Sequence, residues 1–189
     1  MADPVEVPEG LRLDRKAFRA WADERAGRWE RVDSRPVGMA PERLIHARLK
    51  FRVCSALDRA IKAAGVPCEA ITDGFPVEVD ENTDYEPDAL VQCGGGLSLD
   101  DLGTPNPTIV VEVASPSNSR VSLDRKFVDY FQMRSVQHLL MIEGRRRMVA
   151  HSRKAGEQIE TRLIAAGPIV CDPPGLTITV EEIYEGSDL

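Results

Sequence analysis

The chain is predicted to fold as an α/β or α+β domain in which helices pack against a β-sheet. Three observations lead to this prediction. A long amphipathic helix pattern over residues 42–64 is followed by several short strand patterns. Residues 108–114 are nearly all β-branched or small, as in a buried central strand. A second helix pattern and further strands then follow, so we expect a mixed sheet of about five or more strands.

The N-terminal half contains two predicted helices. Residues 14–25 are expected to form the first, with Asp14 as its capping residue. The second, over residues 42–64, has Pro41 in the first-turn position and Gly65 at its left-handed end. Its apolar residues recur at three- and four-residue spacing: Leu44, Ile45, Leu49, Val53, Leu57, Ala60 and Ile61.

The rest of the chain is dominated by strand patterns, which are separated by polar and glycine-containing turns. Residues 29–37 also look extended. A third helix is expected over residues 122–133, with Leu123, Phe127, Tyr130 and Phe131 on one face. We expect Leu49, Val53, Leu57, Val110 and Val113 to be buried. The expected strands span residues 68–71, 75–79, 88–93, 108–114, 138–142, 148–151, 159–164 and 176–180.

Length and cysteine usage indicate an ordinary single domain. With 189 residues, we expect one domain over residues 14–189 after a flexible lead-in over residues 1–13. The cysteines form no CxxC pair, and no histidine lies at zinc-finger spacing from them. We therefore expect reduced, mostly buried cysteines and no zinc site. The cysteines are Cys54, Cys68, Cys93 and Cys171.

Composition is that of a soluble globular protein, with 42% apolar and 29% charged residues. No apolar run could span a bilayer and no signal-peptide pattern opens the chain, so a cytoplasmic location is expected. The net charge of −7 argues against a general nucleic-acid coat protein, because phosphate binding needs dense Lys and Arg. It is compatible with a nuclease that has a local basic strip. The strip would be formed by Arg145, Arg146, Arg147, Arg153 and Lys154.

Glu112 is the residue that points most directly to chemistry. It lies inside the most apolar strand, where a carboxylate is costly to bury unless it is paired or bound to a metal. The alternative is an alternating strand with Glu112 on a solvent-exposed face. Asp88 opens another apolar strand, a position that on its own is often only a turn. Two carboxylates near one end of adjacent strands suit Mg²⁺, and Lys126 on the following helix could stabilise developing charge.

These residues belong to an ordered series of motifs that resembles the PD-(D/E)XK nuclease superfamily. More closely, the chain is similar to the Uma-type restriction-endonuclease family over most of its length. The most specific motif is Val111-Glu112-Val113-Ala114-Ser115-Pro116-Ser117. The other matching segments are Trp29–Asp33, Ala40–His46, Tyr85–Asp88, the Lys126-x-x-x-Tyr130 pair, Val136–Ile142 and Pro174–Leu176.

The resemblance implies a restriction-endonuclease-like α/β fold with a mixed sheet flanked by helices. It implies a Mg²⁺- or Mn²⁺-dependent endonuclease acting on DNA, with Asp88, Glu112 and the Val113 carbonyl as metal ligands. It also implies that Lys126 reaches the site from its helix, because Ala114 occupies the lysine position of a strict Glu-x-Lys motif. The chain departs from the family pattern at Ser34, Ser122 and His138.

Several roles stay open at this stage. Glu30 is either a further catalytic carboxylate or an exposed residue. His46 either supports the site or is a hydrogen-bonded structural histidine. Ser115 could cap the turn after the strand, and Tyr130 lies on the side of Lys126.

Three functions fit the residues. The first is DNA cleavage, for which a homodimer is plausible because cutting both strands needs two active sites. The second is a catalytically silent nuclease-fold module for binding or assembly, which the acidic charge favours. The third is hydrolysis of small phosphoesters.

Overall fold

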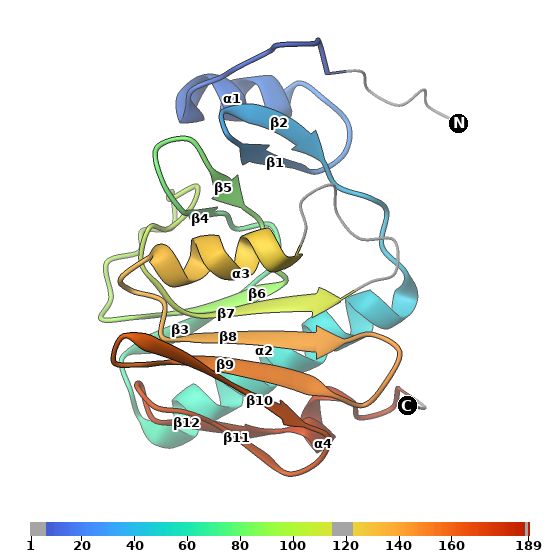
Figure 1. The fold of residues 1–189 in the computed structure, drawn as a ribbon, viewed down its shortest axis with the longest axis vertical. Coiled ribbons are helices and arrows are strands. Elements are labelled where there is room, and N and C mark those ends of the chain that lie inside the picture. Colours follow the sequence, from blue (N-terminus) through green and yellow to red (C-terminus); the bar gives the residue numbers. More distant parts are fainter. Residues whose placement is uncertain (1–6, 115–122, 188) are drawn as a thin grey trace.

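A six-stranded sheet is the centre of the computed structural model, which describes residues 7–114, 123–187 and 189 (Figure 1). The strand order is β10-β9-β8-β7-β6-β3, in which β7 and β8 are parallel and the other neighbours antiparallel. The predicted mixed α/β sheet is therefore confirmed. Its strands are β3 (Cys68–Thr72), β6 (Ala89–Cys93), β7 (Pro107–Ala114), β8 (His138–Glu143), β9 (Val149–Ala155) and β10 (Gln158–Ile164).

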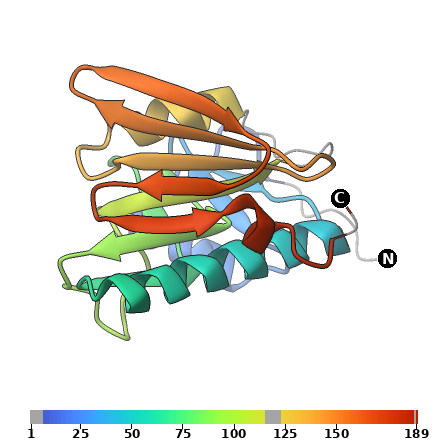
Figure 2. The same ribbon diagram turned by 90° about the horizontal axis from the view of Figure 1, so that it is seen from below.

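Helices cover both faces of this sheet (Figures 1 and 2). Helix α2 (Leu44–Ala64) runs along one face, and α3 (Leu123–Gln132) lies on the other. The hairpin of β11 (Pro168–Cys171) and β12 (Leu176–Thr179), followed by α4 (Val180–Ile183), packs on the α2 side. Among the residues that the structure describes, no helix is both long and apolar enough to cross a membrane.

A second, smaller sheet lies with helix α1 in the upper part of the molecule in Figure 1. Its strand order is β2-β1-β5-β4. Helix α1 begins after Asp14, whose side chain accepts a hydrogen bond from the Ala17 N–H, as its predicted capping role requires. The bounds are α1 (Arg15–Asp23), β1 (Trp29–Val32), β2 (Arg35–Gly38), β4 (Val77–Glu78) and β5 (Asp84–Tyr85).

Strand β7 is a continuous apolar run because the protein covers both of its faces. Val111 and Val113 belong to the cluster under α2, whereas Val110 belongs to the cluster on the α3 side. The residues predicted to be buried are at most 4% exposed: Leu49, Val53, Leu57, Val110 and Val113.

Helix α2 ends where the sequence predicts and begins slightly later. Gly65 has φ 65°, the left-handed conformation expected of a glycine at this position. The helix starts at Leu44 rather than Glu42, because Arg43 is still extended, with φ −89° and ψ 154°. The Glu42 carboxylate forms ion pairs with Arg28 and Lys50 instead of contributing to a first turn.

The segment expected to be extended over residues 29–37 is two strands rather than one. Its turn is Asp33-Ser34, and both residues have positive φ, 50° and 65°. This is the conformation of a tight hairpin turn, which usually shows Asn or Gly in the sequence. Because neither Asn nor Gly is present at Asp33-Ser34, the sequence pattern does not predict a turn there. The sequence patterns also do not predict the short elements β5, β11 and α4.

Two further expectations about side chains need correction. Cys68 and Cys93 are not reduced, because they form a disulfide between β3 and β6, where they are register partners. Cys54 and Cys171 are free thiols. On α3 the fully buried side chains are Lys126 and Tyr130. Phe127 and Phe131, which were expected on the core face, are only partly buried and stack edge to face at 5.1 Å.

Gly144 allows the end of β8 to approach the end of β7. A Cβ atom added at Gly144 would lie 2.6 Å from the Ala114 carbonyl oxygen, so the backbone would have to move. We expect Gly144→Ala to lower the free energy of unfolding by about 1–3 kcal/mol. Urea denaturation checks this, with Glu157→Ala, an exposed turn position, as the control. Equal stability of both variants would contradict the close approach.

Candidate active site

A buried ion-pair cluster lies at the carboxyl end of β7, on the α3 side. Glu112 is 6% exposed, and its Oε1 accepts hydrogen bonds from Lys126 Nζ at 3.0 Å and Tyr130 Oη at 2.8 Å. The same ammonium lies 2.7 Å from Glu30 Oε1, which β1 brings in from the smaller sheet. Lys126 and Tyr130 are four residues apart on α3, so both face the sheet.

The cluster shifts the ionisation of its members. Burial raises the pKa of Glu112, and the nearby charges of Asp88 and Glu30 raise it further against the opposing effect of Lys126. Burial alone would lower the pKa of Lys126, but attraction to Glu112 and Glu30 outweighs it and the pKa is raised. Burial also raises the pKa of the Tyr130 hydroxyl. Lys126 is therefore a fixed cation and Tyr130 a fixed hydrogen-bond donor.

Asp88 is the centre of a second cluster, built mainly from α2. Its Oδ2 lies 3.1 Å from His46 Nε2, and its Oδ1 lies 2.8 Å from Lys50 Nζ. Lys50 also pairs with Glu42 and, at 2.8 Å, with Asp73. The pKa of Asp88 is lowered, because the hydrogen bond from His46 and the charge of Lys50 outweigh the effect of burial.

The backbone of β7 connects the two clusters. The Val113 N–H donates to Asp88 Oδ2 at 2.6 Å, and the Asp88 N–H donates to the Val111 carbonyl at 2.9 Å. Asp88 is thereby held against the chain on either side of Glu112. The charge of Asp88 reaches Glu112, since it contributes to the raised pKa of that residue.

Comparisons with known proteins identify the family of this chain. A model of the Uma2 family, described as "Putative restriction endonuclease", matches residues 15–184. The chain belongs to this family. Among solved structures, it is similar to a protein from Anabaena variabilis described as a putative nuclease of the DUF820 family. The TM-score is 0.68 at 14% identity, with 91% of this chain and 97% of the other covered. A comparison with curated sequences gives no match.

In this Uma2 family member, the tertiary structure gathers most of the residues singled out from sequence. It joins Glu112 to Lys126, Glu30 and Tyr130, and it joins Asp88 to His46 and to the Val113 N–H. Glu30 is buried rather than exposed. Ser115 lies outside the described residues.

Asp88 and Glu112 do not share a group of three or more potential ligand residues whose atoms all lie within 4.8 Å of one another, among the residues that the structure describes. Within the described ranges, one group of potential ligand atoms within 4.8 Å of one another combines Asp88 with Glu42 and His46. Glu112 does not belong to that group, and its hydrogen-bond partners Lys126 and Tyr130 both come from α3. The shared site of Asp88, Glu112 and the Val113 carbonyl remains a prediction.

Lys50 is the site residue that sequence reasoning missed. It is 4% exposed although it is a lysine in the middle of a helix. The available signal was its position four residues after His46, which places both side chains on one helix face. The sequence pattern does not reveal this role, because a lysine next to Leu49 of the apolar face is normally expected to point into solvent.

Two arginines of the basic strip expected near the turn after β8 are paired with carboxylates in this Uma2 protein. Arg147 pairs with Glu181 at 2.9 Å and Arg153 with Glu160 at 2.8 Å. Lys154 donates to the Met133 carbonyl at 2.6 Å. Arg145 and Arg146 are exposed.

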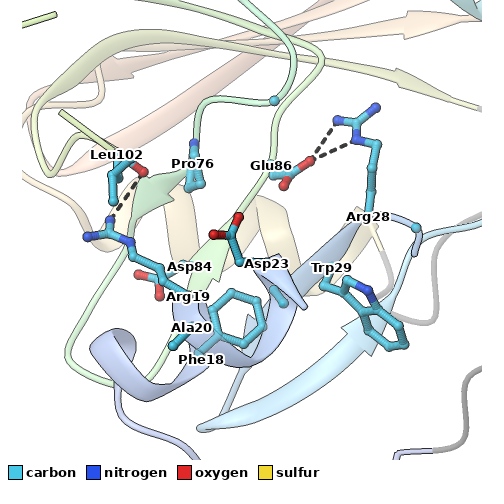
Figure 3. A pocket seen from close by; sticks show the side chains of 13 residues that line it. Phe18, Arg19, Ala20, Asp23, Arg28, Trp29, Pro76, Asp84, Glu86 and Leu102 are labelled. Atoms are coloured by element: carbon cyan, nitrogen blue, oxygen red, sulfur yellow. Dashed lines mark hydrogen bonds and ion pairs between the residues drawn. The ribbon is translucent and has the colours of Figure 1, made fainter. Parts of the chain in front are cut away.

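A cavity of about 510 Å³ lies between α1 and the smaller sheet (Figure 3), and Arg28 on its wall pairs with Glu42 and Asp73 of the Asp88 cluster. Its two arginines are already engaged. Arg19 donates to the Leu102 carbonyl at 3.2 Å and to Glu78 at 2.7 Å, and Arg28 pairs with Glu86 at 2.8 Å. Because Asp23 and Asp84 also line it, this cavity is a poor site for a phosphate group.

Proposed function

We propose that this protein is a divalent-metal-dependent endonuclease that hydrolyses phosphodiester bonds in DNA. The observation that carries the proposal is the buried Lys126 ammonium, held between Glu112 and Glu30 at the end of the central strand. A cation between two buried carboxylates, with a third carboxylate one strand away, is an expensive arrangement for stability alone. Perturbed charges of this kind are concentrated at functional sites.

The residues present suit a hard divalent ion such as Mg²⁺ or Mn²⁺. The donors that Asp88, Glu112 and Glu30 offer are carboxylate oxygens, which such ions prefer. Glu30 supplies a second sign: within the described chain, its Oε2 atom is buried and has no hydrogen-bond partner. A buried oxygen without a partner is costly, and a metal-bound water could satisfy it. In this proposal Asp88 and Glu112 hold the ion, with the Val113 carbonyl as a further ligand.

When bound, such an ion supplies charge that polarises a phosphoryl oxygen and acidifies a water molecule. The protein groups around the ion would orient its carboxylate ligands and neutralise negative charge on the phosphate. Lys126 keeps its proton, so it serves as a fixed charge toward phosphate or water rather than as a base. Tyr130 orients Glu112, and His46 orients Asp88. Two copies of the chain would be needed to cut both strands at one place.

One observation favours the alternative of a catalytically silent module. Lys50 and Lys126 already pair with Asp88 and Glu112, so neither carboxylate needs a metal for charge balance. Incubation of purified protein with supercoiled plasmid DNA, in Mg²⁺, Mn²⁺ or EDTA, separates the two functions. The nuclease proposal expects nicked and linear products only with metal. Intact plasmid in all three, with DNA bound, would support the silent module.

Metal binding should depend on pH through Glu112. Burial raises the pKa of this carboxyl to about 7, so below that pH a bound ion must displace a proton. We expect the Mg²⁺ affinity to fall by up to about tenfold per pH unit as the pH drops below that value. Asp88, whose pKa is lowered, does not titrate there. Calorimetry at pH 6 in two buffers would detect the released proton. Equal proton release by Glu112→Gln would assign it to another group.

A further inference from the structure

Three potential metal ligands from three different strands meet on the far side of the sheet from Lys126. They are His138 on β8, His151 on β9 and Cys171 on β11. Their ligand atoms all lie within 4.8 Å of one another. Each residue is at most 5% exposed. None of them belongs to the candidate active site.

The hydrogen bonds of His138 set the tautomer that a metal ligand requires. His138 Nε2 lies 2.8 Å from the Pro173 carbonyl oxygen, which can only accept. Nε2 therefore carries the hydrogen, and the lone pair is on Nδ1. That Nδ1 atom points at His151 Nε2, 2.9 Å away. A backbone carbonyl that fixes the outer nitrogen of a ligating histidine is a common feature of metal sites.

The charge states also suit a metal that binds nitrogen and sulfur. Burial lowers the pKa of His138, and burial together with His138 and nearby arginines lowers that of His151 to about 4, so both rings are neutral at pH 7. Burial raises the pKa of Cys171 to about 12, so without metal it is a thiol. The nearby cations are Arg153, which pairs with Glu160, and Arg162. Neutral imidazoles and a displaceable thiol proton are the usual starting point for a zinc site.

We propose that His138 Nδ1, His151 Nε2 and Cys171 Sγ bind one borderline-soft divalent cation of the zinc type. Binding replaces the thiol proton, which leaves to solvent, and the His151 ring changes tautomer, so that the hydrogen that Nε2 donates to His138 Nδ1 is lost from Nε2 and one is regained on Nδ1. Zn²⁺, two neutral imidazoles and one thiolate then give a site of net charge +1. His151 also lines a cavity of about 280 Å³, together with Asp172 and Arg153, and water from this cavity would supply the fourth ligand that a site with three protein ligands requires. The ion would link the β11–β12 hairpin to the central sheet. This proposal is independent of nuclease activity.

Sequence patterns do not indicate this site, because its ligands are not at zinc-motif spacing. His138 and His151 lie on adjacent antiparallel strands. They are diagonal neighbours on one face of the sheet, because the register partner of His151 is Leu140, two residues after His138. Cys171 lies on the β11–β12 hairpin, which packs on the α2 side of the sheet. Only the tertiary structure brings the three together.

Cobalt substitution tests the proposal. Metal-free protein is titrated with Co²⁺ and followed by absorption spectroscopy, because a thiolate ligand produces a sulfur-to-cobalt charge-transfer band that oxygen ligands do not. The expected result is that this band saturates at one thiolate-bound Co²⁺ per chain and is abolished by excess Zn²⁺, whereas Co²⁺ at the candidate active site, which has only oxygen ligands, adds nothing to the band. Cys171→Ser and His151→Gln should both lose the band. Two variants are used because either one alone could disturb the buried cluster.

Matched controls separate this site from other metal and thiol groups. Cys54→Ser removes the other free thiol, and Glu112→Gln removes a carboxylate of the candidate active site. Both should keep the charge-transfer band. Absence of the band in the unsubstituted protein, its persistence in Cys171→Ser, or its loss in Cys54→Ser would overturn the proposal.

Discussion

Replacing Lys126 with methionine is expected to lower the free energy of unfolding by about 3–5 kcal/mol. The substitution keeps the apolar stem and removes only the ammonium. Glu30 and Glu112, which are 1% and 6% exposed, would then lie near each other with their shared cation gone. Removing one partner of a buried ion pair leaves an uncompensated charge, which costs far more than the pair itself contributes.

Urea denaturation at pH 7 measures this effect. Lys62→Met is the matched control, because the Lys62 side chain is 72% exposed and its pair with Asp58 is an ordinary helix-surface contact. Its loss should cost no more than about 0.5 kcal/mol. Adding Glu30→Gln and Glu112→Gln to the Lys126→Met variant should restore much of the stability. A loss of under about 1 kcal/mol in Lys126→Met would mean that the carboxylates do not depend on this cation.

Replacing Glu112 with glutamine is expected to reduce metal-dependent DNA cleavage about 1,000-fold or more. The amide keeps the shape of the side chain and can still accept from Lys126 and Tyr130, but it carries no charge for the metal. A metal ion contributes several kcal/mol to the stability of a phosphoryl-transfer transition state, and each 1.4 kcal/mol corresponds to about tenfold in rate. Nicking of supercoiled plasmid under single-turnover conditions measures the loss.

Stability provides the control for this experiment. Because the pKa of Glu112 is raised in the folded protein, its carboxyl favours folding at low pH, and that contribution is lost as the pH rises through about 7. Glu112→Gln should therefore be at least as stable as the unsubstituted protein at pH 8. Glu157→Gln, at an exposed turn position, should cleave at the normal rate. Cleavage by Glu112→Gln within about tenfold of normal would rule out a metal role for Glu112.

Only the tertiary structure could tell whether Glu112 is paired or simply exposed. The same strand could present its glutamate to solvent or to the core, and Glu112 is buried against α3, which supplies Lys126 and Tyr130 as its partners. The phenylalanines of α3 also show that periodicity alone does not decide which side chains are buried. Phe127 and Phe131 look like the core face of the helix by periodicity, but Lys126 and Tyr130 take the fully buried positions because they have a carboxylate to pair with.

Features that depend on neighbours along the chain could be predicted from the sequence alone. Helix α2 follows from a 3.6-residue apolar period and a glycine end, and β7 follows from an unbroken β-branched run around one carboxylate. The ordered series of motifs in the sequence was also enough to name the family. The tertiary structure decided what depends on residues distant along the chain. These are the Lys50 pairs of Asp88, the approach of Glu30, the disulfide between Cys68 and Cys93, and the cluster around His138. Periodicity records which face of an element is apolar, but strand order and register set which polar groups from different elements share that face.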